Sequence, residues 1–177
     1  FFVDGDTIIY RHWLEKAIAF LHGDDQVAGV AGIVHEIAVD DEGRMLSFKK
    51  NRYNQTAQQD QVNVFGGIAV YRRSVLEEVK PFNPYIKATP ELELSLRIRK
   101  AGYRLVRLFA PMAITLAPQR ETFHEILRRS KTNLYAMGDT LHYCRKEGLM
   151  LQYMKERMGF VFQFALGLMI ALAILII

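Results

Sequence analysis

The 177 residues are enough for one domain, and a hydrophobic fraction of 50% is enough to bury a core, which excludes a disordered chain. The net charge of +4 and the pI near 9.2 would fit a nucleic-acid partner, but the basic residues are concentrated after Arg97 and continue to a hydrophobic tail. We therefore expect anionic lipid and phosphate as partners, and no nucleic acid. The single cysteine, Cys144, excludes an intrachain disulfide and is expected to pack in the core.

The chain opens with three apolar residues that lead into two carboxylates, Asp4 and Asp6, one residue apart. Side chains of a strand alternate between its faces, so both carboxylates can point the same way at the carboxyl end of an apolar strand. A divalent cation and its phosphates could be held there. Short acidic pairs also end strands and cap turns, so these residues alone leave both interpretations open.

The next elements are expected to alternate between helix and strand. Apolar spacing predicts an amphipathic helix over about residues 11–21, ended by Gly23, and a strand over residues 27–39. A polar turn follows at 40–43. The segment 47–61 is rich in Lys, Asn and Gln, and we expect a long mobile loop that could act as a lid beside the site.

A short strand at 62–65 is expected to lead into Gly66 and Gly67, followed by a strand at 68–71 and a helix near 73–78. The two glycines could form a tight turn, or they could let an acceptor approach the backbone.

Pro81 and Pro84 interrupt the chain before a helix predicted over 90–101, which Gly102 would end. The i,i+4 spacing of Glu93 and Arg97 favours a solvated ion pair of little energetic weight. A strand is expected to follow over 103–109.

The C-terminal part is expected to be helical. Residues 123–144 carry an apolar stripe that fits either an interfacial helix on an anionic leaflet or a helix packed on the preceding domain. Residues 159–177 are apolar apart from Gln163 and predict a membrane-spanning helix, with a buried core helix as the alternative. Lys155 and Arg157 precede this segment and would place the preceding domain in the cytoplasm, at the cell membrane. Both ends of the chain lie inside expected elements, so we expect a fragment.

Residues 66–73 and 90–103, together with the opening Asp-x-Asp pair, resemble family 2 glycosyltransferases with the GT-A fold. The three motifs occur in the order of that family, and the resemblance covers roughly residues 1–120. It implies an α/β fold with a mixed sheet. We expect residues 1–120 to be the C-terminal part of a GT-A catalytic domain, 121–157 an amphipathic helical region, and 158–177 a truncated transmembrane helix.

The resemblance also implies an activity: metal-dependent, inverting transfer of a sugar from a nucleotide-sugar donor to a glycan or lipid-linked acceptor. Asp4 and Asp6 would bind the donor diphosphate through Mg²⁺ or Mn²⁺, with His124 as a further candidate ligand. Glu91 would be the catalytic base, and Gly66 and Gly67 would contact the acceptor. The base-binding half of such a domain would lie outside this chain, so the fragment alone should bind the donor poorly.

Three departures from the family pattern affect these expectations. Thr89 and Pro90 stand where many members have acidic residues, and residues 113–116 lack the histidine that often ligates the metal. The Gln-x-x-Arg-Trp motif of processive synthases is not found, which favours single addition. A catalytically degenerate scaffold subunit is therefore the alternative, and a haloacid-dehalogenase-like phosphatase is a second one that lacks its later motifs.

Overall fold

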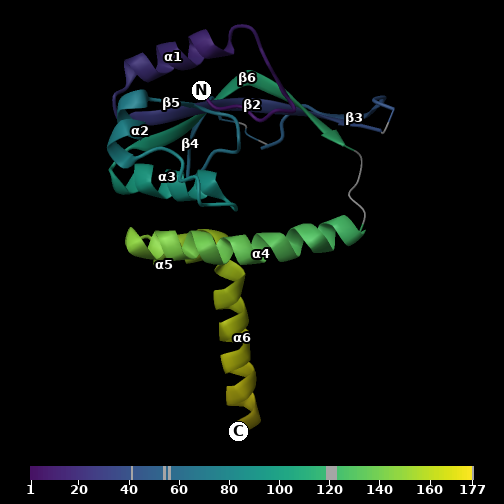
Figure 1. The fold of residues 1–177 in the computed structure, drawn as a ribbon, viewed down its shortest axis with the longest axis vertical. Coiled ribbons are helices and arrows are strands. Elements are labelled where there is room, and N and C mark those ends of the chain that lie inside the picture. The colour runs from purple at the N-terminus through teal and green to yellow at the C-terminus, as the bar shows by residue number, and fades with distance from the viewer. Residues whose placement is uncertain (41, 54, 56, 119–122, 177) are drawn as a thin grey trace.

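The computed structural model describes all residues except 41, 54, 56, 119–122 and 177, and for some residues of the C-terminal helices it describes the backbone alone. Its strands form one mixed sheet, whose bounds are β1 Thr7–Ile9, β2 Val27–Val39, β3 Met45–Lys49, β4 Gln59–Val62, β5 Val70–Tyr71 and β6 Arg104–Pro118. The helices are α1 Trp13–Gly23, α2 Arg73–Val79, α3 Pro90–Lys100, α4 Phe123–Lys146, α5 Met150–Arg157 and α6 Gly159–Ile176. Helix α1 covers one face of the sheet, and α2 and α3 lie on the other (Figure 1).

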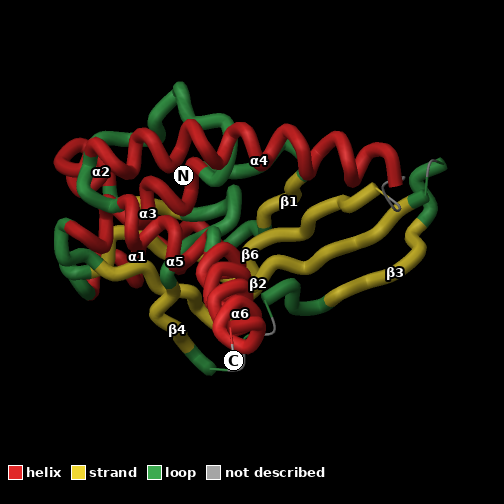
Figure 2. Tube along the Cα trace, turned by 90° about the horizontal axis from the view of Figure 1, so that it is seen from below, coloured by secondary structure: helices red, strands yellow, loops and turns green. Residues whose placement is uncertain are grey.

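The sheet is built around β2 and β6, which run parallel from Val27 and Arg104 to Val39 and Pro118. The strand order is β1-β6-β2-β3, as Figure 2 shows from below, and β4 and β5 pair with β6 and β2. All pairs except β2 with β6 are antiparallel. The predicted α/β fold with a mixed sheet is therefore confirmed.

Strand β6 is longer than the sequence predicts, because it continues through Pro111 to Pro118 instead of ending at Phe109. A proline lacks the N–H that a sheet ladder needs, so it normally interrupts a central strand. Here Pro111 pairs with Ile33 at a point where the register of β2 and β6 shifts, and the irregularity accommodates it.

The prediction of a long loop over 47–61 is wrong at both ends. Residues up to Lys49 belong to β3, which pairs with β2, and residues from Gln59 belong to β4, which pairs with β6. All five residues of β3 are exposed, including the apolar Met45, Leu46 and Phe48, and the strand is held to the sheet by its backbone ladder with β2. The loop prediction rested on the polar residues from Lys49 onward, but a strand at a sheet edge needs no apolar pattern to pair.

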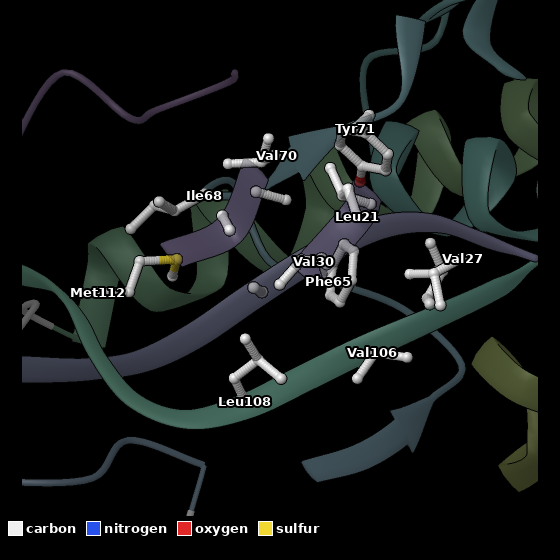
Figure 3. Packing of buried hydrophobic residues seen from close by; sticks show 14 of the residues in the cluster. Leu21, Val27, Val30, Phe65, Ile68, Val70, Tyr71, Val106, Leu108 and Met112 are labelled. Atoms are coloured by element: carbon white, nitrogen blue, oxygen red, sulfur yellow. The ribbon is translucent and has the colours of Figure 1, made fainter. Parts of the chain in front are cut away.

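Two hydrophobic clusters hold the helices to the sheet. The larger cluster joins α1, β2, β5 and β6, and Figure 3 shows part of it, including Val30, Phe65, Tyr71 and Met112. The smaller cluster joins α3 to the C-terminal helices α4 and α5; its buried members are Leu92, Leu96, Cys144, Leu149 and Tyr153. Burial raises the pKa of the Cys144 thiol to about 12, so this cysteine packs in a core as predicted.

Helices α4 and α5 form a layer beneath α3, and α6 projects from this layer away from the sheet (Figure 1). Met137 of the predicted apolar stripe is buried, whereas Phe123, Leu127 and Leu134 are exposed. One part of the stripe therefore packs on the domain and another part does not. The predicted membrane-spanning helix is not found: within the described residues, no helix combines the length and the apolar character that crossing a membrane requires.

Candidate functional site

The opening segment reaches the site by pairing with the strand region after the two glycines. Phe2 forms an isolated antiparallel bridge with Ala69, in which each backbone N–H donates to the other residue's carbonyl, at 2.9 and 3.1 Å. The carboxylates do not follow an apolar strand as predicted, because Gly5 and Asp6 form a turn and β1 begins only at Thr7. The bridge at Phe2 and the packing of its ring against Tyr71 and Phe82 therefore hold the chain ahead of Asp4.

Asp4 lies directly against Gly67. A Cβ built on Gly67 would lie 2.2 Å from both carboxylate oxygens of Asp4, so only glycine leaves that carboxylate its place. Asp4, Gly66, Gly67 and Glu91 all line one cavity of about 310 Å³. Gly66, Gly67 and Glu91 thus lie at the same cavity as Asp4, although up to 87 residues of chain separate them from it.

Asp6 does not line this cavity. Its side chain is exposed and accepts a long hydrogen bond from the hydroxyl of Thr7, at 3.4 Å, and its carbonyl accepts from the amide of Leu116. The strand alternation that the prediction assumed is absent, because residues 5 and 6 form a turn, and the role of Asp6 stays a prediction.

The end of β6 lies beside this turn. Thr115 pairs with Thr7 across the ladder, so the stretch 113–116, which lacks the histidine expected from the resemblance, lies beside the turn at residues 5 and 6. Thr115 is buried, and its hydroxyl oxygen has no hydrogen-bond partner among the described residues.

Glu91 occupies the first turn of α3, directly after Pro90 at the first helical position. Proline is pre-organised for that position, and the helix dipole favours an ionised carboxylate near it. Glu91 is half-buried and also lines a second cavity of about 470 Å³, whose wall includes Phe65 and Arg157. The carboxylate is therefore reachable from two sides.

Tyr71 is a site residue that the sequence analysis did not single out. It is buried and lines the first cavity, and its phenol oxygen has no hydrogen-bond partner among the described residues. Burial and the nearby charge of Glu91 raise the pKa of the phenol, so the group keeps its proton at neutral pH. The hydroxyl oxygen is itself inaccessible to solvent, so Tyr71 contributes a buried, neutral phenol near Glu91. Its place at the end of β5, the strand that follows Gly66 and Gly67, was the available signal.

Comparison with known proteins shows which solved structures have a similar fold. No family model matches the chain, and no curated protein sequence matches it. Among solved structures it is similar to GalNAc-T7, crystallised with UDP, GalNAc and Mn²⁺, at a TM-score of 0.50 and 15% sequence identity. The match covers 68% of this chain and 28% of that chain. The chain has a GT-A-like fold. Membership of family 2 in particular stays a prediction, because this level of identity shows the fold alone.

We tested whether the site of this GT-A-like chain fits a divalent cation. No cluster of three or more His, Cys, Asp or Glu side chains that could hold a metal is found within the described residues. Asp4 lies against Gly67 on the first cavity, which Glu91 also lines. Mg²⁺ is often bound by one or two carboxylates together with substrate phosphates, so Asp4 fits this mode. The side chain of His124 lies outside the described residues.

Proposed function

We propose that this chain is part of a glycosyltransferase that moves a sugar from a nucleotide-sugar donor to an acceptor hydroxyl. The observation that carries the proposal is the meeting of Asp4, Gly67 and Glu91 at one cavity. A carboxylate for the donor side and a carboxylate for the acceptor side are the two groups that such a transfer needs. The GT-A-like fold and a neighbour crystallised with UDP and Mn²⁺ support it.

The proposed reaction is a direct displacement. The Glu91 carboxylate removes the proton of the acceptor hydroxyl, whose oxygen attacks the anomeric carbon while the nucleoside diphosphate leaves from the opposite face. Attack opposite the leaving group inverts the anomeric configuration. A positioned general base typically contributes about 10²- to 10⁴-fold in rate. Asp4 would hold the divalent cation, which neutralises the charge that develops on the diphosphate when it is bound.

The lining of the first cavity suits a sugar ring. Phe2 and Phe82 meet edge to face with ring centroids 4.8 Å apart, and Tyr71 packs against both. Ligand cavities typically combine such apolar walls with a few polar groups that fix orientation. Here the polar residues are Asp4, Glu91 and Asn83, and the acceptor hydroxyl would lie among them.

The test is transfer by the full-length protein, screened over nucleotide sugars with Mn²⁺ or Mg²⁺. Glu91→Gln keeps the shape of the side chain but removes its basicity, so we expect a fall in kcat of at least about 10²-fold. Glu15→Gln, an exposed site on α1, is the matched control. Wild-type transfer by a folded Glu91→Gln protein would refute the role of Glu91.

We further propose that the C-terminal helices contact a membrane and that the acceptor is lipid-linked, with the catalytic part on the cytoplasmic side. The support is apolar surface without a covering element on α6, where six large side chains are exposed: Phe160, Phe162, Phe164, Leu166, Leu168 and Met169. Lys155 and Arg157 precede this helix and suit anionic head groups.

A non-catalytic binding subunit is the second candidate. It is favoured by the small number of candidate metal ligands, since Asp6 does not line the first cavity and residues 113–116 lack a histidine. Under this alternative, the full-length protein binds no nucleotide sugar in a metal-dependent way, which calorimetry with Mn²⁺ present and absent would reveal.

A further inference from the structure

The segment that leads into Glu91 is held in a strained conformation. Thr89 adopts φ 53° and ψ 42°, the left-handed region, directly before Pro90 and the first turn of α3. This region is unfavourable for a β-branched residue and costs on the order of 1–3 kcal/mol, so it persists only where surrounding contacts fix it. The contacts that fix it come from outside the sheet domain.

Two hydroxyl groups of the C-terminal helices bind this segment. The Thr140 hydroxyl of α4 lies 2.7 Å from the carbonyl oxygen of Ala88, to which it donates, with its own helix carbonyl at Ala136 as a longer alternative at 3.1 Å. The Tyr153 hydroxyl of α5 lies 3.1 Å from Oγ1 of Thr89. Thr140 and Tyr153 are both fully buried. Hydrogen bonds of buried hydroxyls are costly to break, so the two contacts fix Ala88 and Thr89 firmly.

The conformation of Thr89 sets the first turn of α3. Its carbonyl oxygen accepts hydrogen bonds from the amides of Leu92 and Glu93, at 3.1 and 3.3 Å. Glu91 lies between Thr89 and these two donors. A rotation at Thr89 would therefore move the Glu91 carboxylate relative to Asp4 across the first cavity.

We propose that Tyr153 and Thr140 are positioning residues, which act through Thr89 to hold the Glu91 carboxylate in its reactive place. The inference rests on the proposed function of Glu91 as the base. It assigns a role in catalysis to helices α4 and α5, which contribute no residue to the first cavity. The Tyr153 ring packs in the smaller cluster, but its hydroxyl has Thr89 as its hydrogen-bond partner among the described residues.

The test uses the full-length protein and the variant Tyr153→Phe, which keeps the ring in the cluster and removes only the hydroxyl. We expect kcat to fall about 10- to 100-fold while the KM for the donor stays near wild type and urea unfolding remains a single cooperative transition, since a small misplacement of a catalytic group is enough for this effect. Tyr135→Phe on α4 is the matched control, because that side chain is 73% exposed. Thr140→Val should lower kcat in the same way, and Thr140→Ser should restore it.

A second readout does not depend on activity. Hydrogen exchange at the amides of Leu92 and Glu93 should accelerate in Tyr153→Phe and not in Tyr135→Phe, because both amides donate to Thr89. Unchanged exchange, or accelerated exchange with wild-type kcat, would overturn the inference. A wild-type protein that transfers no sugar from any donor would instead refute the proposed function, whatever the exchange shows, and the positioning role would fall with it.

Discussion

Gly67 lies where a side chain would occupy the space of the Asp4 carboxylate. The overlap would be with both carboxylate oxygens, at 2.2 Å, and not with backbone. A flexible side chain can rotate away at little cost in stability, but Asp4 would then leave the cavity. The requirement for glycine here is therefore a requirement of the site and not of the fold.

We predict that Gly67→Ala lowers metal-dependent transfer by about 10²-fold, because displacing a catalytic group by roughly 1 Å can cost that much. Gly23→Ala is the matched control, since a Cβ at this end of α1 meets nothing within 4 Å and the residue lies outside the cavity. Urea unfolding of both variants should stay close to wild type. The prediction fails if Gly67→Ala transfers sugar as fast as Gly23→Ala does.

For single residues, the sequence predicted the site where a short motif specifies the type of residue. Asp4, Gly67 and Glu91 were all proposed from short patterns, and the structure brings them to one cavity. The alternation argument for Asp6 assumed a strand that begins only at Thr7. Tyr71 was missed because a tyrosine after an apolar strand resembles an ordinary core residue, and its unpartnered hydroxyl is visible only in three dimensions.

Helix α3 is covered on two sides, and this buries charged side chains that the sequence analysis expected to be solvated. The larger cluster contacts it through Leu94 and Ile98, and the smaller cluster through Leu92 and Leu96. The i,i+4 pair of Glu93 and Arg97 is consequently buried, with both Arg97 contacts to the carboxylate within 2.8 Å. The expectation of a solvated pair is wrong, because helical spacing carries no information on what packs around the helix.

Arg97 also holds the connection between α2 and α3. Its guanidinium donates to the backbone carbonyls of Val79, Lys80 and Pro81 in addition to the Glu93 carboxylate. We predict that Glu93→Gln destabilises the protein by about 3–5 kcal/mol, because it leaves a buried charge without its counter-ion.

Urea unfolding would measure this loss, with Glu77→Gln as the matched control. Glu77 pairs with Arg73 at the same i,i+4 spacing on α2, but both side chains are exposed. Exposed pairs contribute about 0–1 kcal/mol, so the control substitution should hardly change the free energy of unfolding. Equal effects of the two substitutions would show that burial does not decide the strength of the α3 pair.

Helices and strands with a clear apolar pattern were predicted well. Strands that are held mainly by pairing with a neighbouring strand were not. Strand β2 was predicted at its observed bounds, because a continuous apolar run is typical of a strand buried on both faces. The end of β3 and the start of β4 were assigned to a loop, because strands at a sheet edge are held by their ladder partners and need no apolar pattern. The extension of β6 beyond Pro111 required a register shift that no local pattern indicates.

For the whole molecule, the smaller cluster connects α3 to the C-terminal helices. It fixes α4 and α5 beneath α3, and the hydroxyls of Thr140 and Tyr153 continue that connection to the segment before Glu91. A displacement of α4 or α5 would therefore move the segment that leads into Glu91. Under the proposed membrane contact, binding of these helices to a lipid surface would be one cause of such a displacement.

We predict that the full-length protein binds vesicles of equal parts phosphatidylcholine and phosphatidylglycerol more tightly than vesicles of phosphatidylcholine alone, with salt weakening the difference. Phe164→Asp combined with Leu168→Asp should lower the binding at least about tenfold, because burial of each such side chain contributes about 1.5–3 kcal/mol. Met45→Asp is the matched control, since that exposed side chain lies on β3, away from α6 (Figure 1). Flotation of vesicles with each protein measures the bound fraction. If both variants bind as the wild type does, the lipid surface is not the partner of α6.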